Sequence, residues 1–284
     1  MVILERAKAK ITLSLDVLGK RDDGYHDVEM VMTTIDFSDR LELYPLTQDR
    51  IEVTADNQYV PNDERNLAYK AAHELKKIYQ IPYGVRIDIQ KKIPVSAGLG
   101  GGSSDAAAVL RGLNRLWGLQ LSLYRLAEIG SYIGSDVPFC IYGATALVSG
   151  RGEKVQKLSS PPSCWVVLAK PDIGVSTRNV FRHIDMNMIH HPDTDGVLRA
   201  ISEKSFYRLS DSIGNALEEI TFQYYPETKR VKEKMMHYGI SGVLMSGSGP
   251  TIFGLVEQQS KARRVYNGLR GFCREVYMVR MIGV

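Results

Sequence analysis

A run of small residues that follows Pro94 has the composition of a phosphate-binding loop. Four of the five residues in Gly98–Gly102 are glycine, so only Leu99 carries a side chain and backbone N–H groups can approach an anion closely. An Ala-rich helical pattern follows, and a helix N-terminus adds unpaired N–H groups and the positive end of its dipole. A plain turn needs only one or two glycines. The sequence therefore predicts a phosphate site over Gly98–Ser104, although the run is neither a Walker A loop nor a dinucleotide fingerprint.

A second run of small residues, Ser246–Gly249, is followed by Pro250 and lies between two strand-like segments. By itself, a hairpin connection is the simpler interpretation. Beside a phosphate loop, the same run becomes a candidate second wall of one site.

Two further segments combine an acid or an imidazole with turn residues. Asp136 follows a predicted helix end at Gly134 and precedes Pro138, which should hold Val137 extended. A lone aspartate in such a turn is most often a local cap. Gly24–His26 follows a charged turn, and an ordinary hairpin explains that segment equally well.

Four polar residues resemble metal ligands only superficially: His190, His191, Asp193 and Asp195. Their spacing matches no zinc motif, so a solvated connection is the better interpretation. The three cysteines are widely separated, which argues against a disulfide framework and a cysteine zinc site.

Composition narrows the class of protein. The chain has 284 residues, of which 44% are hydrophobic and 24% charged, and this length favours two domains. The net charge is +4, but acids and bases alternate as in Glu227–Lys234, so nucleic acid is not expected as a partner. No apolar run approaches the roughly 20 residues of a membrane span, and the N-terminus becomes charged too soon for a signal peptide. We expect a cytoplasmic protein without a membrane partner.

The elements that must position these residues are strands grouped with helices. Ile11–Val17 alternates strictly, which predicts a half-buried strand with Lys10 and Thr12 on its polar face. Helical patterns cover the three segments 66–79, 105–117 and 123–133, and the last two should end in left-handed glycines, Gly118 and Gly134. Without a regular alternation of strand and helix, the fold class is predicted as α+β, with a linker at Pro161 and Pro162.

In this order, the segments resemble the GHMP kinases over essentially the whole chain. The resemblance rests on Ala9–Leu13, Lys20–His26, the 94–108 loop, Ile133–Pro138, Gly150–Glu153 and Met245–Thr251. It implies a two-domain α+β fold, residues 1–159 and 160–284, with the active site in the cleft between the domains. ATP and Mg²⁺ are the implied co-substrate and cofactor, the protein is expected as a monomer or homodimer, and the magnesium ligands stay unassigned.

The segment around Tyr25 and His26, together with Gly134–Pro138, resembles the members that phosphorylate the 2-hydroxyl of a diphosphocytidyl sugar alcohol in isoprenoid precursor synthesis. Carried over by position, Asp136 is the catalytic base and Lys10 its charged partner. The ATP-binding residues are Asn66, Pro94, Ala97, Gly98, Leu99, Gly100, Gly101, Gly102, Ser103 and Ser104. The acceptor-binding residues are Thr12, Tyr25, His26, Phe181, Ser246, Gly247, Ser248 and Gly249, with Tyr25 and Phe181 stacking on cytosine and His26 bonding to its polar edge.

The chain departs from the family at two positions. The family has Pro-Ala-Lys-x-Asn, whereas this chain has Lys8 and Thr12 in place of the proline and the asparagine. These departures leave open a GHMP kinase for another alcohol such as mevalonate or homoserine, and a nucleotide-binding homologue with reduced catalysis. An RNA-binding protein is a third alternative, because half of the implied fold resembles ribosomal-protein-like domains.

Overall fold

The computed structural model describes residues 1–283, which form two compact units. The first unit combines residues 1–9, 37–95 and 100–143, and the second combines residues 10–36, 96–99 and 144 onward. Both units are built from separated segments, so the boundary predicted between residues 159 and 160, a single cut, stays a prediction.

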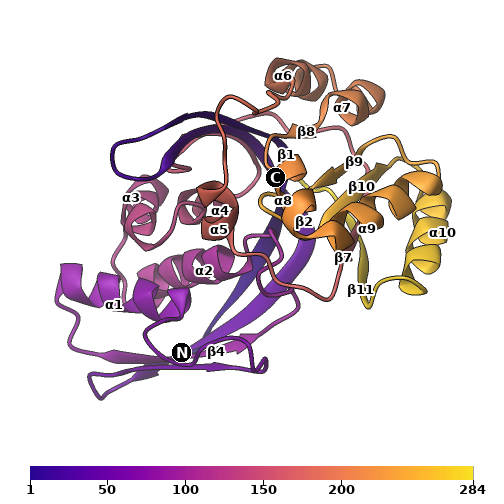
Figure 1. Cartoon of the computed structure of the whole chain (residues 1–284). Helices are drawn as coiled ribbons and strands as arrows, with labels where there is room; N and C mark the ends of the chain where they lie inside the picture. The colour runs from indigo at the N-terminus through magenta and orange to yellow at the C-terminus, as the bar shows by residue number, and fades with distance from the viewer. Residues whose placement is uncertain (284) are drawn as a thin grey trace. The chain divides into compact units, whose positions relative to one another are not determined.

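The first unit contains strands β3 (Ile51–Ala55) and β4 (Gly84–Gln90), which run parallel to each other. Strand β4 also pairs antiparallel with the second half of β2 (His26–Leu46). Four helices gather on one face of these strands (Figure 1): α1 (Leu67–Tyr79), α2 (Gly101–Leu116), α3 (Leu123–Ile133) and α4 (Val137–Tyr142). The residues Ala106–Leu110 of α2 are all buried, because small side chains let this helix pack closely on its neighbours.

The second unit has two groups of strands. Strand β1 (Ile3–Lys20) is shared with the first unit and pairs parallel with β8 (Gly214–Asn215), while β2 pairs with β5 (Thr145–Gly150), which pairs with β6 (Lys154–Lys157). An antiparallel sheet of order β11-β7-β10-β9 comprises β7 (Trp165–Lys170), β9 (Val243–Met245), β10 (Ile252–Val256) and β11 (Glu275–Arg280).

Six helices accompany these strands: α5 (Thr177–Arg182), α6 (Thr194–Ser202), α7 (Phe206–Ser212), α8 (Glu218–Tyr224), α9 (Pro226–His237) and α10 (Gln259–Arg270). Helices α9 and α10 lie along the antiparallel sheet (Figure 1). Every residue of β10 is buried, which explains why this strand is a continuous apolar run. The α+β class is confirmed, and no helix of the described residues is long and apolar enough to cross a membrane.

Strand β1 differs from its prediction. Alternation predicted a half-buried strand over Ile11–Val17, but residues 9–17 are buried on both faces. The polar phase is hydrogen-bonded instead of solvated, through the pairs Lys10–Thr12 at 3.1 Å, Ser14–Thr194 at 2.7 Å and Asp16–His191 at 2.8 Å. Alternating polarity reports which side chains share a face, and partners far along the chain decide whether that face meets water.

Two predicted helix ends were tested. Gly118 has φ +64, so the left-handed residue after α2 is confirmed. Gly134 was predicted to be left-handed too, and this was wrong, because its φ of −175 leads the chain in extended form toward α4. The expectation that Pro138 holds Val137 extended was also wrong. Val137 starts α4, where a proline in the first turn removes an N–H that has no helical acceptor.

Candidate functional site

The first glycine loop, Gly98–Ser104, turns directly into α2. Gly98 and Gly100 have φ of +73 and +69, and Gly100 is the N-cap residue. The helix therefore begins four residues earlier than the predicted Asp105. The N–H of Ser104 donates to the Gly100 carbonyl at 2.8 Å, which is the first hydrogen bond of the helix. The N–H groups of Gly101, Gly102 and Ser103 lie before this first helical bond. Such a helix start is the arrangement on which the predicted phosphate site depends, and phosphate binding itself stays a prediction.

The two serines of this loop have different environments. Ser104 is 2% exposed, and its hydroxyl donates to the Lys8 carbonyl at 2.6 Å. Ser103 is partly exposed, and its Oγ lies 3.9 Å from the point where a Cβ on Gly134 would be. Ser104 thus anchors the helix start to β1, while Ser103 lies beside the turn that carries Asp136.

A buried charge cluster lies behind the first glycine loop. The Lys91 ammonium is 2.5 Å from Asp39 and 2.7 Å from Asp105, and all three side chains are at most 4% exposed. Asp39 also accepts the N–H groups of Lys92 and Ile93 at 2.6 and 2.8 Å. The cluster ties β2, the segment before the loop and the first turns of α2 together. Asp39 and Lys91 carried no recognisable signal, because they are 52 residues apart in the chain.

Burial, with the nearby Asp39 charge, raises the pKa of Asp105 to about 7, although Lys91 opposes this rise. The Oδ1 atom of Asp105 is buried without a hydrogen-bond partner. Gly101 belongs to the same packing, because a Cβ there would lie 3.1 Å from Ile93 Cγ2 and 3.4 Å from Lys91 Nζ. At this position the absence of a side chain therefore gives room to the cluster.

The second glycine loop, residues 245–251, connects β9 to β10, so the predicted strand–loop–strand arrangement is confirmed. It touches the first glycine loop. The Ser246 hydroxyl donates to the Gly98 carbonyl at 2.9 Å, and a Cβ on Gly98 would lie only 2.1 Å from the Ser246 carbonyl oxygen. A close approach of two backbones is therefore the reason for glycine at position 98.

Lys10 lies against both loops. Its N–H donates to the Leu99 carbonyl at 3.0 Å, and its Nζ donates to Thr12 Oγ1 at 3.1 Å. A Cβ on Gly247 would be 3.3 Å from that Nζ. Lys10 is 4% exposed and Thr12 is 0% exposed, so the amine is held between the second glycine loop and its own strand.

Asp136 occupies the N-cap position of α4, but its side chain forms no cap hydrogen bond there. The structure therefore does not support the simpler interpretation of Asp136 as a local cap. Asn66, in contrast, caps α1. Its Oδ1 accepts the Ala68 N–H at 2.9 Å and its Nδ2 donates to the Pro61 carbonyl at 2.8 Å, so both ends of its amide have structural partners.

The predicted base-stacking residues come together in part. The His26 and Phe181 rings are 5.4 Å apart and tilted by 47°, whereas Tyr25 is 53% exposed and lies under the Arg151 guanidinium at 5.2 Å. Burial and the Lys20 charge lower the pKa of His26 below its ordinary value of 6.5. Near neutral pH its imidazole is therefore uncharged, with one donor and one acceptor nitrogen.

Helix α5, which carries Phe181, is joined to the second glycine loop. The hydroxyls of Thr177 and Ser248 are 2.8 Å apart, and Ser176 caps the helix through the Asn179 N–H. The aromatic residue and the loop thus have a fixed relation within the second unit.

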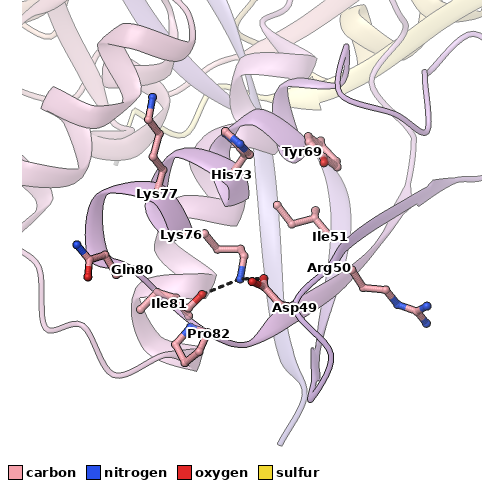
Figure 2. Close-up of a pocket in the computed structure, with 10 residues that line it drawn as sticks. All are labelled: Asp49, Arg50, Ile51, Tyr69, His73, Lys76, Lys77, Gln80, Ile81 and Pro82. Atoms are coloured by element: carbon pink, nitrogen blue, oxygen red, sulfur yellow. Dashed lines mark hydrogen bonds and ion pairs between the residues drawn. The ribbon is translucent and has the colours of Figure 1, made fainter.

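A hollow in the first unit contains none of the predicted site residues. It has a volume of about 550 Å³ and is lined by residues of α1 and of the neighbouring segments (Figure 2). Lys76, its most enclosed cation, bonds to Asp49 at 2.6 Å and to the Ile81 carbonyl at 2.8 Å. The contacts of Lys76 in this hollow are therefore structural, and no residue with a predicted catalytic or binding role lines it.

Comparison with known proteins identifies the family that this chain resembles. The pattern of the GHMP kinases N terminal domain matches residues 66–144, and that of the GHMP kinases C terminal domain matches residues 197–275. The chain is 59% identical over 283 residues to a protein of Bacillus subtilis (strain 168) named 4-diphosphocytidyl-2-C-methyl-D-erythritol kinase. It is 57% identical to the protein of that name from Bacillus cytotoxicus, and each alignment covers 100% of this chain and 98% of the relative.

Solved structures give the same picture. A crystal structure of 4-(cytidine 5'-diphospho)-2C-methyl-D-erythritol kinase superposes with a TM-score of 0.83 at 34% identity, covering 98% of this chain and 99% of that one. A homoserine kinase from Cytophaga hutchinsonii superposes with a TM-score of 0.78 at 21% identity, over 99% and 96% of the two chains, and this likeness concerns the fold alone.

Proposed function

The chain belongs to the GHMP kinase family, in the branch of the 4-diphosphocytidyl-2-C-methyl-D-erythritol kinases, and from this we propose that it transfers the γ-phosphoryl group of ATP to the 2-hydroxyl of 4-diphosphocytidyl-2-C-methyl-D-erythritol. One observation supports the proposal most directly. The two glycine loops are in backbone contact, and the Lys10 amine lies against the second of them. The start of the predicted phosphate-binding loop, Gly98 and Leu99, thus lies with a buried cation in the second unit.

The first glycine loop receives the ATP phosphates in this proposal. The N–H groups of Gly101, Gly102 and Ser103 and the α2 dipole attract the anion. Phosphoryl transfer has a loose transition state, so the enzyme contributes mainly position and charge stabilisation. Asn66, Pro94, Ala97 and Leu99, also carried over as ATP-binding residues, would support the loop or the nucleoside.

Asp136 accepts the proton of the acceptor hydroxyl as its oxygen attacks the γ-phosphorus. Lys10 stabilises the negative charge that develops on the transferring group and favours the ionised aspartate. The bond from the γ-phosphorus to the bridging oxygen of ATP breaks as the new P–O bond forms, which leaves ADP and the phosphorylated alcohol.

The cytosine of the acceptor is assigned to Tyr25, His26 and Phe181. Stacking on aromatic rings is favourable for any base, so the choice of cytosine must come from hydrogen bonds. A neutral His26 offers a donor and an acceptor, which suits the cytosine edge, where an amino group lies beside a ring nitrogen. Thr12 and four residues of the second glycine loop, Ser246, Gly247, Ser248 and Gly249, would contact the rest of the acceptor.

Magnesium enters with ATP in this proposal. Among the described residues, no group of three or more His, Cys, Asp or Glu side chains could hold a metal. Mg²⁺ in kinase sites is usually bound by one or two carboxylates together with phosphate oxygens and water, so ATP would supply most of its ligands. When bound, the ion neutralises charge on the phosphates.

The test is phosphorylation of a panel of alcohols by the purified protein with ATP and Mg²⁺. We expect turnover of the diphosphocytidyl alcohol and none of mevalonate or homoserine. Asp136→Asn should keep the fold and the ATP affinity but lower kcat by at least ~10²-fold, the usual contribution of a positioned proton acceptor. Turnover of mevalonate instead would refute the substrate, and near-normal activity of the variant would refute the role of Asp136.

A further inference from the structure

Asn215 has its whole side chain directed at the second glycine loop and its own turn. Its Nδ2 donates to the carbonyls of Met245 and Gly247 at 2.8 and 2.7 Å, and its Oδ1 accepts the Leu217 N–H at 2.9 Å. Two carbonyl acceptors at one end and an N–H donor at the other suit an amide and no other side chain of this size. Rotation of the side chain would break all three bonds.

The backbone of Asn215 is held by the strand that carries Lys10. Strand β8 pairs with Ser14 and Leu15 of β1, and the Ala216 N–H donates to the Leu15 carbonyl at 2.9 Å. Asn215 thus connects β1 with the loop against which the Lys10 amine lies.

Glu218 holds the same loop from the neighbouring position. Its Oε1 accepts the Met245 N–H at 3.0 Å, and its Oε2 is 2.5 Å from the Lys232 ammonium. Both backbone groups of Met245 are therefore bonded to side chains of the 215–218 segment. Of Asn215 and Glu218, only Asn215 also bonds to the Gly247 carbonyl.

The hydrogen bond from Asn215 to the Gly247 carbonyl fixes the orientation of a whole peptide group. In a trans peptide the carbonyl and the next N–H point in opposite directions, so the bond from Asn215 also directs the N–H of Ser248. Gly247 has φ +57, and a Cβ added to it would lie 3.3 Å from Lys10 Nζ. The neighbouring Ser248 hydroxyl contacts Thr177 at the start of the helix that carries Phe181. A displaced peptide at residues 247–248 would disturb the surroundings of the amine and of that helix together.

We propose that Asn215 is a positioning residue for phosphoryl transfer: it holds the Gly247–Ser248 peptide in place beside Lys10 without contacting either substrate. The proposal rests on the function proposed above. A displacement of about 1 Å can lower the rate of a positioned reaction by as much as 10²-fold, so the effect should appear in kcat. Binding of ATP depends on the first glycine loop and should change little.

The experiment compares Asn215→Asp with Asn114→Asp. Asn114, at the end of α2, brackets the Leu121 backbone in the same manner, with Nδ2 on its carbonyl at 3.0 Å and Oδ1 on its N–H at 2.9 Å. Both substitutions replace an amide donor by a carboxylate oxygen facing a carbonyl. We expect Asn215→Asp to lower kcat by roughly 10- to 100-fold with KM for ATP within about 3-fold, and Asn114→Asp to keep kcat near that of the wild type. Asn215→Ala serves if the aspartate variant does not fold.

Hydrogen exchange of the 243–251 peptide is measured in parallel and does not depend on the acceptor. Faster exchange in the Asn215 variant alone supports the proposal, even if the wild type proves inactive on the diphosphocytidyl alcohol and the proposed function fails. Unchanged exchange and kcat overturn it. A change in KM alone, or equal losses of kcat in both variants, also overturns it, because binding or general stability would then be the cause.

Discussion

Thr12 is one of the two residues at which this chain departs from its family, and its hydroxyl has a specific partner in the structure. Its Oγ1 accepts a hydrogen bond from Lys10 Nζ at 3.1 Å in a fully buried setting. The threonine therefore orients the amine that is proposed to stabilise the transferring phosphoryl group. An asparagine would keep an acceptor oxygen and add an amide donor.

Two substitutions at this position separate the parts of that role. Thr12→Val keeps the shape and removes the acceptor, so kcat should fall by about 5- to 10-fold, the value of one net hydrogen bond, while KM for ATP stays nearly unchanged. Thr12→Asn should raise kcat/KM for the diphosphocytidyl alcohol by roughly 3- to 30-fold. Steady-state kinetics measures both. An unchanged rate in the valine variant would show that Lys10 is oriented without the hydroxyl.

His26 should give the reaction an acid limb. Burial lowers the pKa of His26 from its ordinary value of 6.5, so the ring becomes protonated only at a pH below 6.5. The protonated ring no longer has an acceptor nitrogen. We expect kcat/KM for the diphosphocytidyl alcohol to be level from pH 8 to about 6.5 and to fall below that. His26→Asn keeps a donor and an acceptor and should lose this limb, whereas His190→Asn should retain it. Identical profiles in all three proteins would exclude His26 from base recognition.

At the scale of elements, the site depends on two loops that approach each other through their backbones. Gly98 has a left-handed backbone and no space for a side chain, because the Ser246 carbonyl occupies the place of its Cβ. The bond from Ser246 to the Gly98 carbonyl then sets the loops in register. A side chain at position 98 would therefore displace one of the loops.

Gly98→Ala should separate the loops. We expect a loss of kcat of at least ~10²-fold, because the 2.1 Å contact can be relieved only by displacing one loop. Gly118→Ala is the control, since Gly118 has φ +64 but nothing within 4 Å of the Cβ position. That variant should lose about 1–2 kcal/mol of stability from backbone strain and keep its kcat. Equal kinetic losses would attribute the effect to stability.

At the scale of the molecule, the buried cluster of Asp39, Lys91 and Asp105 links folding to pH. Burial raises the pKa of Asp105 to about 7 in the folded state, against an ordinary value of 3.8. Between these values the folded protein binds more protons than the unfolded chain, so stability falls as pH rises. The contribution is fully present below pH 3.8 and is lost as pH rises through about 7.

Asp105→Asn should remove this dependence. Its unfolding free energy relative to the wild type should rise between pH 5 and 8, by at most about 1.4 kcal/mol per pH unit, the value for one proton. Urea unfolding at several pH values measures the difference. A constant difference across that range would mean that Asp105 is ionised throughout.

Features of this protein that depend on local chemistry could be predicted from its amino-acid sequence. Clustered glycines before a helix predict an anion site because backbone N–H groups need close approach, and small residues between Val243–Met245 and Ile252–Val256 predict a strand connection. Motif order was enough to indicate the family. The first helix turn was placed too late because glycine is a poor helix former, yet tertiary packing overrides that preference at Gly101.

The contacts between residues that are distant in the chain could not be predicted in this way. Three sets of contacts join residues that lie 14 to 180 positions apart: the bonds from β1 to Thr194 and His191, the Asp39–Lys91–Asp105 cluster, and the bonds from Asn215 to the second glycine loop. A single sequence records the type and spacing of its residues, whereas these contacts depend on how separate segments pack. The physical reason is that a buried polar group must find a hydrogen-bond partner, and the fold, not the local pattern, determines which one is within reach.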